Sequence, residues 1–340
     1  MREKSDMGTA SELREAPEAV CRQPDLLALP VAELAARLRR RPPAVVVTCA
    51  RGSSAHAATF AKHLIELYLG IPVAAAAPNI ASVYRRKLRL EGQFFLAVSQ
   101  SGRSDDLVAN AAMAREAGAL TAALVNDTQS PLAAACDIVL PICAGPERSV
   151  AATKTFVASL AALLRLVAAW TEERSLAAAV ERLPERLASA GALDWSAAIS
   201  PIAAAPSLIV IGRGPTLAIA REAALKLKEI ANLHAEAFSG AEFLHGPVAL
   251  VASRYPILAL MPTDAAGEGM RALVRDLRDK GAFVFAASRD GALPALAPDC
   301  PETDAICLVQ SFYAMAVSLA ARLGIDPDRP RHLQKITRTR

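Results

Sequence analysis

The sequence predicts an α/β fold made of two tandem domains, each a doubly wound parallel sheet with helices on both faces. The first observation is an internal repeat, in which PAVVVTCARGSSAHAATFAKHLIEL from Pro43 is similar to SLIVIGRGPTLAIAREAALKLKEI from Ser207. The second is the alternation of short β-branched runs, such as VVVT and LIVI, with alanine- and leucine-rich segments of helical periodicity. Parallel sheets covered on both faces have this pattern. We therefore expect two flavodoxin-like or Rossmann-like domains.

A second pair of segments supports the duplication. FFLAVSQSGRSDDLVANAAMAREAGALTAALVND, from Phe94, is similar to PILALMPTDAAGEGMRALVRDLRDKGAFVFAASRD, from Pro256. Both pairs of segments are separated by about 160 residues, as a tandem repeat requires. Each member of the second pair is expected to form a strand, a loop and a helix, and then a short strand after Gly118 or Gly281.

The two copies meet where a helical pattern encounters Pro184, Gly191 and Pro201. We place the boundary near Ala190. The expected organisation is an N-terminal helical arm in residues 1–30, a first domain in 31–190, a second domain in 191–325 and a C-terminal tail in 326–340.

The composition argues against large charged ligands. The net charge is only +4 and neither sign forms a long block, so no footprint for nucleic acid or an anionic membrane is present. An aromatic content of 4% does not favour a platform for stacked bases. The longest apolar segment, FVASLAALLRLVAAW, contains Arg165 and follows Lys154, which indicates a buried or dimer-core helix rather than a membrane span. A small anionic ligand remains possible.

The cysteines and the N-terminal segment predict a cytoplasmic protein. The N-terminal MREKSDMGTASELREAPEAV is too charged for a signal peptide, and the chain has no C-x-x-C pair. A reduced compartment is therefore expected, with the cysteines acting as small buried hydrophobic residues. They are Cys21, Cys49, Cys136, Cys143, Cys300 and Cys307.

The stretch SQSGRSDD suggests a phosphate site, because it follows a predicted buried strand and precedes a helix. Ligands of open parallel sheets bind beyond the carboxyl ends of the strands, near helix N-termini. Ser99, Ser101 and Ser104 supply hydroxyl donors there, and Gly102 leaves the backbone uncrowded. The alternative is that these serines only cap the helix. A nucleophilic serine is disfavoured, since the G-x-S-x-G spacing is absent.

The second copy has Met261-Pro262-Thr263-Asp264 at the corresponding place. We interpret this difference as an anion site that one copy has kept and the other has lost.

Five segments in order resemble the sugar isomerase (SIS) domain family, in the tandem arrangement of the isomerase half of glucosamine-6-phosphate synthase and its stand-alone deaminase and isomerase relatives. The resemblance covers nearly the whole chain. The segments are CARGSSAHAA from Cys49, SQSGRSDD, PERSVAATKTF from Pro146, GRGPTLAIAREAALKLKEIANLHAEAFSGAEFLHGP from Gly212, and PRHLQKIT from Pro330.

The resemblance implies a sugar phosphate substrate, no cofactor and no metal. The residues that it implies for binding the substrate and its phosphate are Ser53, Ser54, Ser99, Gln100, Ser101, Ser104 and Val150. Glu229 looks like the base that moves a proton between sugar carbons one and two, a task that one carboxylate can perform in both steps. Lys226 would orient Glu229 or the developing charge.

His245 and Lys335 complete the implied catalytic set. His245 resembles the ring-opening histidine of the family, and histidine exchanges protons near neutral pH. In that architecture it comes from the neighbouring subunit, which implies a homodimer with shared active sites. Lys335 matches the tail lysine that closes over the site and forms an imine with the sugar carbonyl in the synthase.

The residues alone leave other interpretations open. Glu222, Lys226 and Glu229 stand at i, i+4 and i+7, so they could form an exposed ion-paired helix face. Lys335 could lie in a solvated tail, and Lys154 on a helix surface. A metal site fits no specific zinc spacing; the candidate ligands would be His234, Glu236, Glu242 and His245.

The segment before Pro43 is too short for the glutaminase domain of the synthase, so we expect no glutamine-driven amination by this chain alone. Deamination of glucosamine 6-phosphate to fructose 6-phosphate and ammonia is the favoured reaction. A fructosamine-6-phosphate deglycase and a non-catalytic sugar-phosphate-binding regulator are the alternatives, although the N-terminal segment cannot supply the helix-turn-helix of such regulators. Arg103, where the family often has an acidic residue, could extend toward a second anion.

Overall fold

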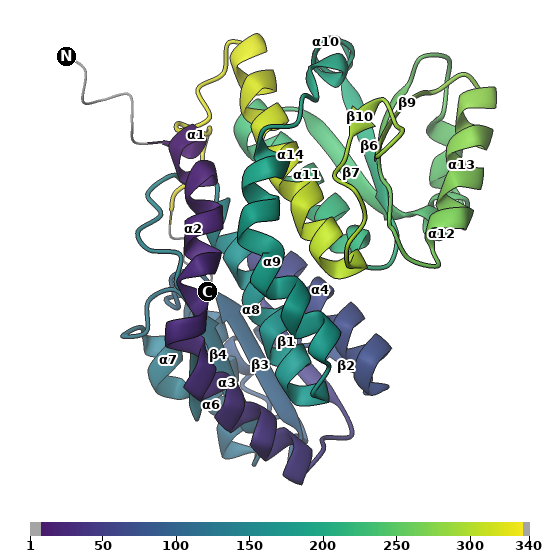
Figure 1. The fold of residues 1–340 in the computed structure, drawn as a ribbon. Helices are drawn as coiled ribbons and strands as arrows, with labels where there is room; N and C mark the ends of the chain where they lie inside the picture. Colours follow the sequence, from purple (N-terminus) through teal and green to yellow (C-terminus); the bar gives the residue numbers. More distant parts are fainter. Residues whose placement is uncertain (1–7, 336–340) are drawn as a thin grey trace. The chain divides into compact units, whose positions relative to one another are not determined.

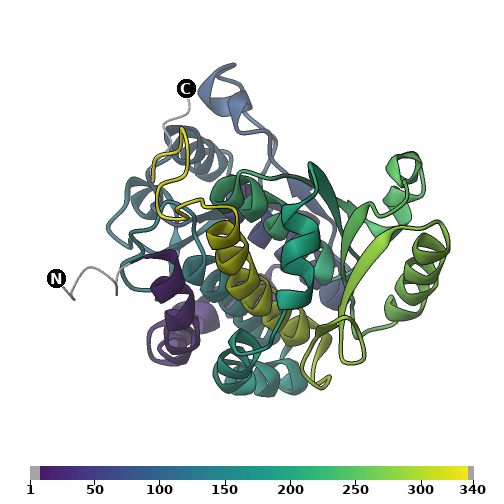
Figure 2. The same ribbon diagram turned by 90° about the horizontal axis from the view of Figure 1, so that it is seen from above.

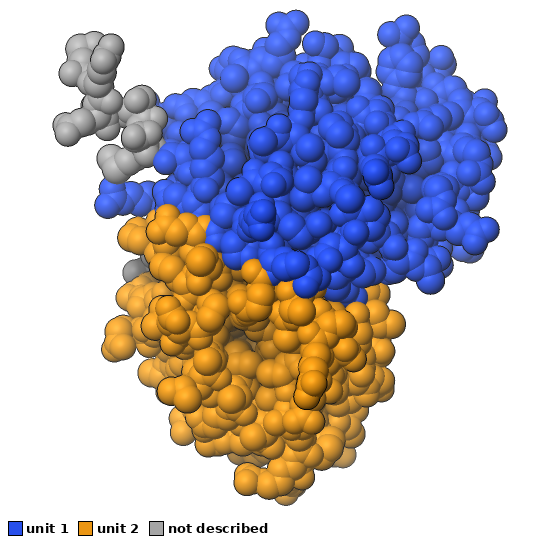
Figure 3. Space-filling model, viewed as in Figure 1, with its two compact units in different colours: residues 1–17, 148–153, 182–333 blue, residues 18–147, 154–181, 334–340 orange. Residues whose placement is uncertain are grey.

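The computed structural model describes residues 8–335 (Figure 1). They form two compact units. Unit 1 contains the residues up to Pro17, Arg148–Thr153 and Arg182–Leu333, and unit 2 contains Glu18–Glu147, Lys154–Glu181 and the residues from Gln334 on (Figure 3). The outer ends of the predicted arm and tail, residues 1–7 and 336–340, lie outside the described residues. The predicted domain boundaries stay predictions.

Unit 2 contains a five-stranded parallel sheet of order β2-β1-β3-β4-β5. Its strands are β1 (Val46–Ala50), β2 (Val73–Ala75), β3 (Phe94–Ser99), β4 (Leu120–Val125) and β5 (Ile138–Pro141). Ala50 pairs with Val98, so β1 and β3 end side by side. The order reverses between these two strands, which is where ligands bind in open α/β sheets.

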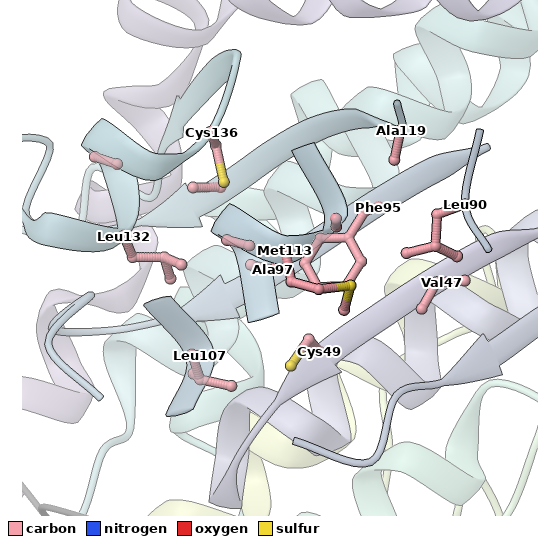
Figure 4. Packing of buried hydrophobic residues seen from close by; sticks show 14 of the residues in the cluster. Val47, Cys49, Leu90, Phe95, Ala97, Leu107, Met113, Ala119, Leu132 and Cys136 are labelled. Carbon is pink, nitrogen blue, oxygen red and sulfur yellow. The ribbon is translucent and has the colours of Figure 1, made fainter. Parts of the chain in front are cut away.

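Helices cover both faces of this sheet. On one face, Phe95 and Ala97 pack with Leu107, Met113 and their neighbours in an apolar cluster (Figure 4). On the other face, Gln23 donates from its buried amide to the carbonyls of Ile142 and Ala158. The helices are α2 (Ala16–Cys21, which begins in unit 1), α3 (Gln23–Arg40), α4 (Gly52–Leu69), α5 (Asn79–Ser82), α6 (Asp105–Glu116), α7 (Pro131–Ala135) and α8 (Lys154–Thr171).

Unit 1 repeats this topology. Its parallel sheet has the order β7-β6-β8-β9-β10. In both sheets the second strand of the unit is at one edge, followed by the first, third, fourth and fifth strands. The strands are β6 (Ser207–Gly212), β7 (His234–Ser239), β8 (Pro256–Leu260), β9 (Phe283–Ser288) and β10 (Leu293–Pro294). The predicted α/β fold and its two tandem sheets are confirmed, as are the short strands after Gly118 and Gly281.

The sheet of unit 1 lies between α13 on one side and α14 on the other, as the view from above shows (Figure 2). Met270 and Leu273 of α13 pack with Ile257 and Ala259 of β8. The helices are α1 (Thr9–Glu12), α9 (Arg174–Gly191, which begins in unit 2), α10 (Ile199–Ala203), α11 (Thr216–Ala231), α12 (Gly240–Phe243), α13 (Gly267–Asp279) and α14 (Pro301–Arg322), with 3-10 turns at Leu13–Glu15, Ser196–Ala198 and Pro247–Leu250.

Two helices, α8 and α14, are long and apolar enough to cross a membrane by length and composition. In the most apolar window of each, 83% and 78% of the residues are buried inside the protein, as is usual for core helices. The prediction that the apolar segment after Lys154 is a buried helix is therefore confirmed.

The cysteines are free thiols in three environments. Cys49, Cys136 and Cys307 are buried as expected, and burial is the main cause that raises the pKa of each of these thiols to about 12. They are therefore protonated and unreactive at neutral pH. The expectation is wrong for Cys21, which is exposed, and Cys143 and Cys300 are only partly buried.

Two carboxylates of unit 1 hold the segment that contains Val150. The buried side chain of Glu12 accepts hydrogen bonds from the backbone N–H groups of Arg148 and Ser149. Asp328 accepts from the backbone and hydroxyl of Thr9 at 2.6 and 2.7 Å, and from the hydroxyl of Ser149 at 3.3 Å. Residues near both ends of the chain thus fix one internal loop.

Glu12→Ala is expected to lower the free energy of unfolding by about 2–4 kcal/mol, because two backbone donors lose a charged acceptor. Glu18→Ala is the matched control. Glu18 makes an exposed ion pair with Arg22, so its loss should cost only about 0.5 kcal/mol. Urea denaturation followed by circular dichroism measures both, and equal losses in the two variants would contradict the clamping role of Glu12.

Candidate functional site

The SQSG loop leaves the carboxyl end of β3 in a shape fixed by its own hydrogen bonds. Ser99 Oγ accepts from the Gly102 N–H at 3.1 Å, and Ser101 Oγ accepts from the Arg103 N–H at 3.4 Å. The carbonyl of Gln100 accepts from Asn126, in the loop after β4. The oxygens of Ser99 and Ser101 therefore serve as acceptors inside the loop, which leaves each hydroxyl proton for another acceptor.

Gly102 is required for two reasons. Its φ is +63°, in the left-handed region that favours glycine. A Cβ at this position would lie 2.1 Å from Ser130 Oγ and 2.5 Å from Ser130 Cβ. A larger residue would therefore displace either this loop or Ser130, the N-cap of α7.

The second serine pair lies beside this loop. Ser53 and Ser54 occupy the first turn of α4, directly after β1, and both are half-buried. Arg51 connects the two loops, because its guanidinium binds the buried carboxylate of Asp106 at 2.6 Å. This ion pair neutralises Asp106 at the N-terminus of α6, where the helix dipole favours an anion. The structure thus brings the two predicted serine groups together.

The capping alternative finds no support at Ser104. Ser104 stands at the N-cap of α6 with extended backbone, but its side chain makes no capping hydrogen bond. Its hydroxyl is therefore not used by the helix. Arg103 pairs with Asp127 at 2.8 Å, and its suggested role toward a second anion stays a prediction.

Lys335 has a specific partner in unit 2, so the solvated-tail alternative is wrong. Its Nζ lies 3.5 Å from Oε2 of Glu147, whose side chain is fully buried. Glu147 also accepts hydrogen bonds from the backbone N–H and the hydroxyl of Thr155. Glu147 is not among the site residues expected from the sequence, although it stands in the family-like segment PERSVAATKTF.

In unit 1, helix α11 carries a buried ion cluster formed by Glu222, Lys226 and Glu229. Lys226 Nζ lies 3.3 Å from Glu222 and 2.5 Å from Glu229. Glu222 and Lys226 have side-chain exposures of 0% and 1%, whereas that of Glu229 is 21%. Tyr313 of α14 donates its hydroxyl to Glu222 at 3.0 Å. The alternative of an exposed ion-paired face is wrong, and only Glu229 offers an oxygen to solvent.

The cluster keeps Lys226 charged. Burial lowers the pKa of this amine, but attraction and hydrogen bonding by Glu222 and Glu229 outweigh burial and raise the pKa above its ordinary value of 10.5. Because the folded-state pKa is the higher one, the contribution to stability is complete below pH 10.5 and is lost as pH rises through the folded-state pKa.

The remaining predicted residues lie as follows. His245 is exposed on the turn after α12, and Val150 is partly buried in the segment held by Glu12. Lys154 is buried, so the suggestion that it lies on a helix surface is wrong. Within residues 8–335, no group of three or more His, Cys, Asp and Glu side chains could hold a metal ion.

The predicted site residues divide between the units. Unit 2 holds Lys335 together with the serine set, which is Ser53, Ser54, Ser99, Gln100, Ser101 and Ser104. Unit 1 holds Val150, Lys226, Glu229 and His245. The first set contains hydroxyl groups at the ends of β1 and β3, and the second contains a carboxylate, Glu229, with a buried lysine partner.

Comparison with curated proteins finds relatives that are longer than this chain. A glutamine–fructose-6-phosphate aminotransferase (isomerizing) from Symbiobacterium thermophilum is 33% identical over 326 residues, covering 88% of this chain and 52% of the relative. The chain thus spans about half the length of this curated relative.

Comparison with solved structures finds matches that span almost all of the chain. A protein from Silicibacter pomeroyi DSS-3, provisionally assigned as a phosphosugar isomerase, is 47% identical with a TM-score of 0.90, covering 94% of this chain and 99% of that protein. A glucosamine-6-phosphate deaminase from Thermotoga maritima shares the fold, with a TM-score of 0.75 at 21% identity and coverage of 96% and 100%.

The SIS domain model matches residues 43–169 and 202–288, which contain most of both sheets. The two matched segments correspond to the two copies found in the sequence. The chain belongs to the SIS domain family.

Proposed function

We propose that this protein is a cytoplasmic phosphosugar enzyme of the SIS family that converts glucosamine 6-phosphate and water into fructose 6-phosphate and ammonia. The observation that carries the proposal is the ion cluster of α11. In it, the partly exposed carboxylate of Glu229 is paired with the buried ammonium of Lys226. Such a carboxylate has a fixed orientation and remains accessible to a substrate. A base that moves one proton between neighbouring carbons needs both properties.

In this proposal the serine loops bind the phosphate. Ser53, Ser54, Ser99, Gln100, Ser101 and Ser104 supply the donors, assisted by the N-termini of α4 and α6. Val150 completes the substrate contacts. The loop is pre-shaped by Gly102 and its internal hydrogen bonds, so little ordering free energy is lost on binding.

The reaction then needs three proton movements on the same sugar phosphate. His245, contributed by a second subunit, assists ring opening to the aldehyde. Glu229 removes the proton from carbon two, which gives an enolamine, and returns a proton to carbon one, which gives the imine at carbon two. Water adds to this imine and ammonia leaves, so that the ketone of fructose 6-phosphate remains. Lys226 keeps the Glu229 carboxylate oriented throughout.

Lys335 supplies the closing group of the proposed site. Its contact with Glu147 gives the amine a defined position in unit 2. Closure of the chain end over the substrate would bring this amine to the sugar.

The relatives support a sugar phosphate as substrate. The Symbiobacterium enzyme is named for fructose 6-phosphate and for isomerisation, and this chain matches about half of it. The Silicibacter protein is named only as a phosphosugar isomerase and matches along 99% of its length.

The direct test is incubation of the purified protein with glucosamine 6-phosphate, followed by assays of ammonia and fructose 6-phosphate together. Equimolar formation of both supports the proposal. Binding without products would overturn it and favour a fructosamine-6-phosphate deglycase or a non-catalytic regulator, which turnover of fructosamine 6-phosphate distinguishes. Absence of binding would show that the serine loops hold another ligand.

Glu229→Gln is expected to lower kcat by about 10²–10⁴, because the proton-transfer group is lost. Substrate affinity should change little, and the loss of stability should be smaller than that of Lys226→Met, since Lys226 keeps its buried pairing with Glu222. Steady-state kinetics and calorimetric titration with the substrate measure both effects. The control is Glu236→Gln, which changes an exposed glutamate on β7. Wild-type turnover by Glu229→Gln would remove this residue from the mechanism.

Lys226→Met is expected to lower stability more than Glu229→Gln does, because the carboxylates of Glu222 and Glu229 then lie together without a cation. Breaking such a buried ionic group costs about 3–5 kcal/mol of unfolding free energy. Thermal and urea unfolding of Lys226→Met and Glu229→Gln in parallel test this asymmetry. Equal unfolding free energies of the two variants would show that the charge of Lys226 does not stabilise the cluster.

The shared homodimeric site predicts complementation between subunits. His245→Ala and Glu229→Gln should each be inactive alone, whereas mixed dimers contain one site with both residues intact. Unfolding and refolding an equimolar mixture should then restore about a quarter of wild-type activity, since half of the dimers are mixed and each has one good site. No recovery, with mixed dimers demonstrated by mass spectrometry, would place both residues of a site in one chain.

A further inference from the structure

Unit 1 contains a cavity that the proposed reaction does not use. Its volume is about 420 Å³, within the range of small-molecule sites. It is lined by residues at the carboxyl ends of β8, β9 and β10 and by side chains of α9, α13 and α14. Of these elements, β9, β10, α9, α13 and α14 are labelled in Figure 1. The cavity therefore lies at the edge of the sheet where parallel α/β folds bind ligands.

Three arginines line this cavity. Arg271 comes from α13 and Arg289 follows β9; both are exposed, and neither forms an ion pair with any residue in the described range 8–335. Arg186 of α9 has a side-chain exposure of only 19%. Its Nε is buried without a hydrogen-bond partner among the described residues. An arginine with an unused buried donor is costly unless a ligand satisfies that donor.

The acidic groups of the cavity do not cancel this charge. Asp304 is occupied, because it accepts from Arg186 at 2.7 Å, from the Thr263 hydroxyl at 2.7 Å and from the Asp299 N–H. Asp290 is the second carboxylate of the lining. The three arginines therefore leave an excess of one positive charge, with Arg271 and Arg289 available to an anion.

The chemistry of the lining selects the ligand. Arginine side chains bind phosphate oxygens in a bidentate manner, and they do so better than lysine. Leu193, Met261 and Leu296 provide apolar surface beside them, enough for the carbon skeleton of a small metabolite. A free inorganic ion would leave this surface unused.

We propose that the cavity of unit 1 is a second ligand site, which binds a small organic phosphate through Arg271 and Arg289. The site is separate from the serine loops of unit 2 and does not depend on the proposed reaction. It also revises the interpretation that the second copy lost its anion site. The Ser-rich loop is absent there, but arginines from α13 and from the end of β9 replace its donors.

The test uses the arginine reagent phenylglyoxal on the full chain, with inorganic phosphate as the probe. Peptide mass spectrometry gives the modification rate of each arginine, with sodium chloride replacing phosphate at equal ionic strength. Phosphate at ten times its Kd should slow the modification of Arg271 and Arg289 by about tenfold, since only about 9% of sites stay empty. Arg275 is the internal control, because it is exposed on the same helix and does not line the cavity.

Equal rates at Arg271 and Arg289 with and without phosphate, up to the solubility limit, would overturn the proposal. Equal protection of Arg275 would also overturn it, since the effect would then be nonspecific. Titration of the serine-loop variant Ser101→Ala/Ser104→Ala with fructose 6-phosphate gives a second readout. The second site is supported if the serine-loop variant still binds fructose 6-phosphate and loses this binding when Arg271→Gln and Arg289→Gln are added. Adding Arg275→Gln instead should leave the binding unchanged. Persistence of binding after all four changes contradicts the second site.

Discussion

The buried charge of Lys226 is the constraint on which the rest of unit 1 depends. An ammonium taken out of water costs several kcal/mol unless carboxylates and hydrogen bonds compensate fully. Glu222 and Glu229 provide the compensation, and Tyr313 of α14 satisfies a further oxygen of Glu222. Helices α11 and α14 must therefore pack in one register. The same arrangement leaves Glu229 as the accessible end of the cluster. The packing of α11 against α14 therefore also determines where the proposed base lies.

The two copies share a sheet order and differ in the loops at the carboxyl edge. In unit 2 the edge carries serines, a glycine in the left-handed region beside Ser130, and an arginine paired with Asp106. In unit 1 it carries a cavity with two arginines that have no carboxylate partner among residues 8–335. Under the two proposals both edges accept an anion, but with different donors. Duplication thus preserved the scaffold, while the loops acquired separate chemistry.

The repeat and the strand patterns were sufficient to predict the fold, because parallel strands buried on both faces are distinctive in sequence. Burial on helices was not predictable in the same way. The spacing of Glu222, Lys226 and Glu229 is the same for an exposed face and for a buried cluster, and only the packing of α14 decides between them. The contacts of Glu12 with Ser149, and of Glu147 with Lys335, join residues far apart in the chain, so no local pattern reveals them.

The central claim is that Glu229 moves the proton of carbon two, and proton NMR of glucosamine 6-phosphate during turnover tests it most directly. The account predicts that the signal of the carbon-two proton disappears at the rate at which ammonia is released, and that deuteration of this carbon slows ammonia release severalfold. Consumption of the sugar with the carbon-two proton retained would contradict this role of Glu229. A second contradicting result would be an active Glu229→Gln variant combined with a rate of ammonia release that deuteration does not change.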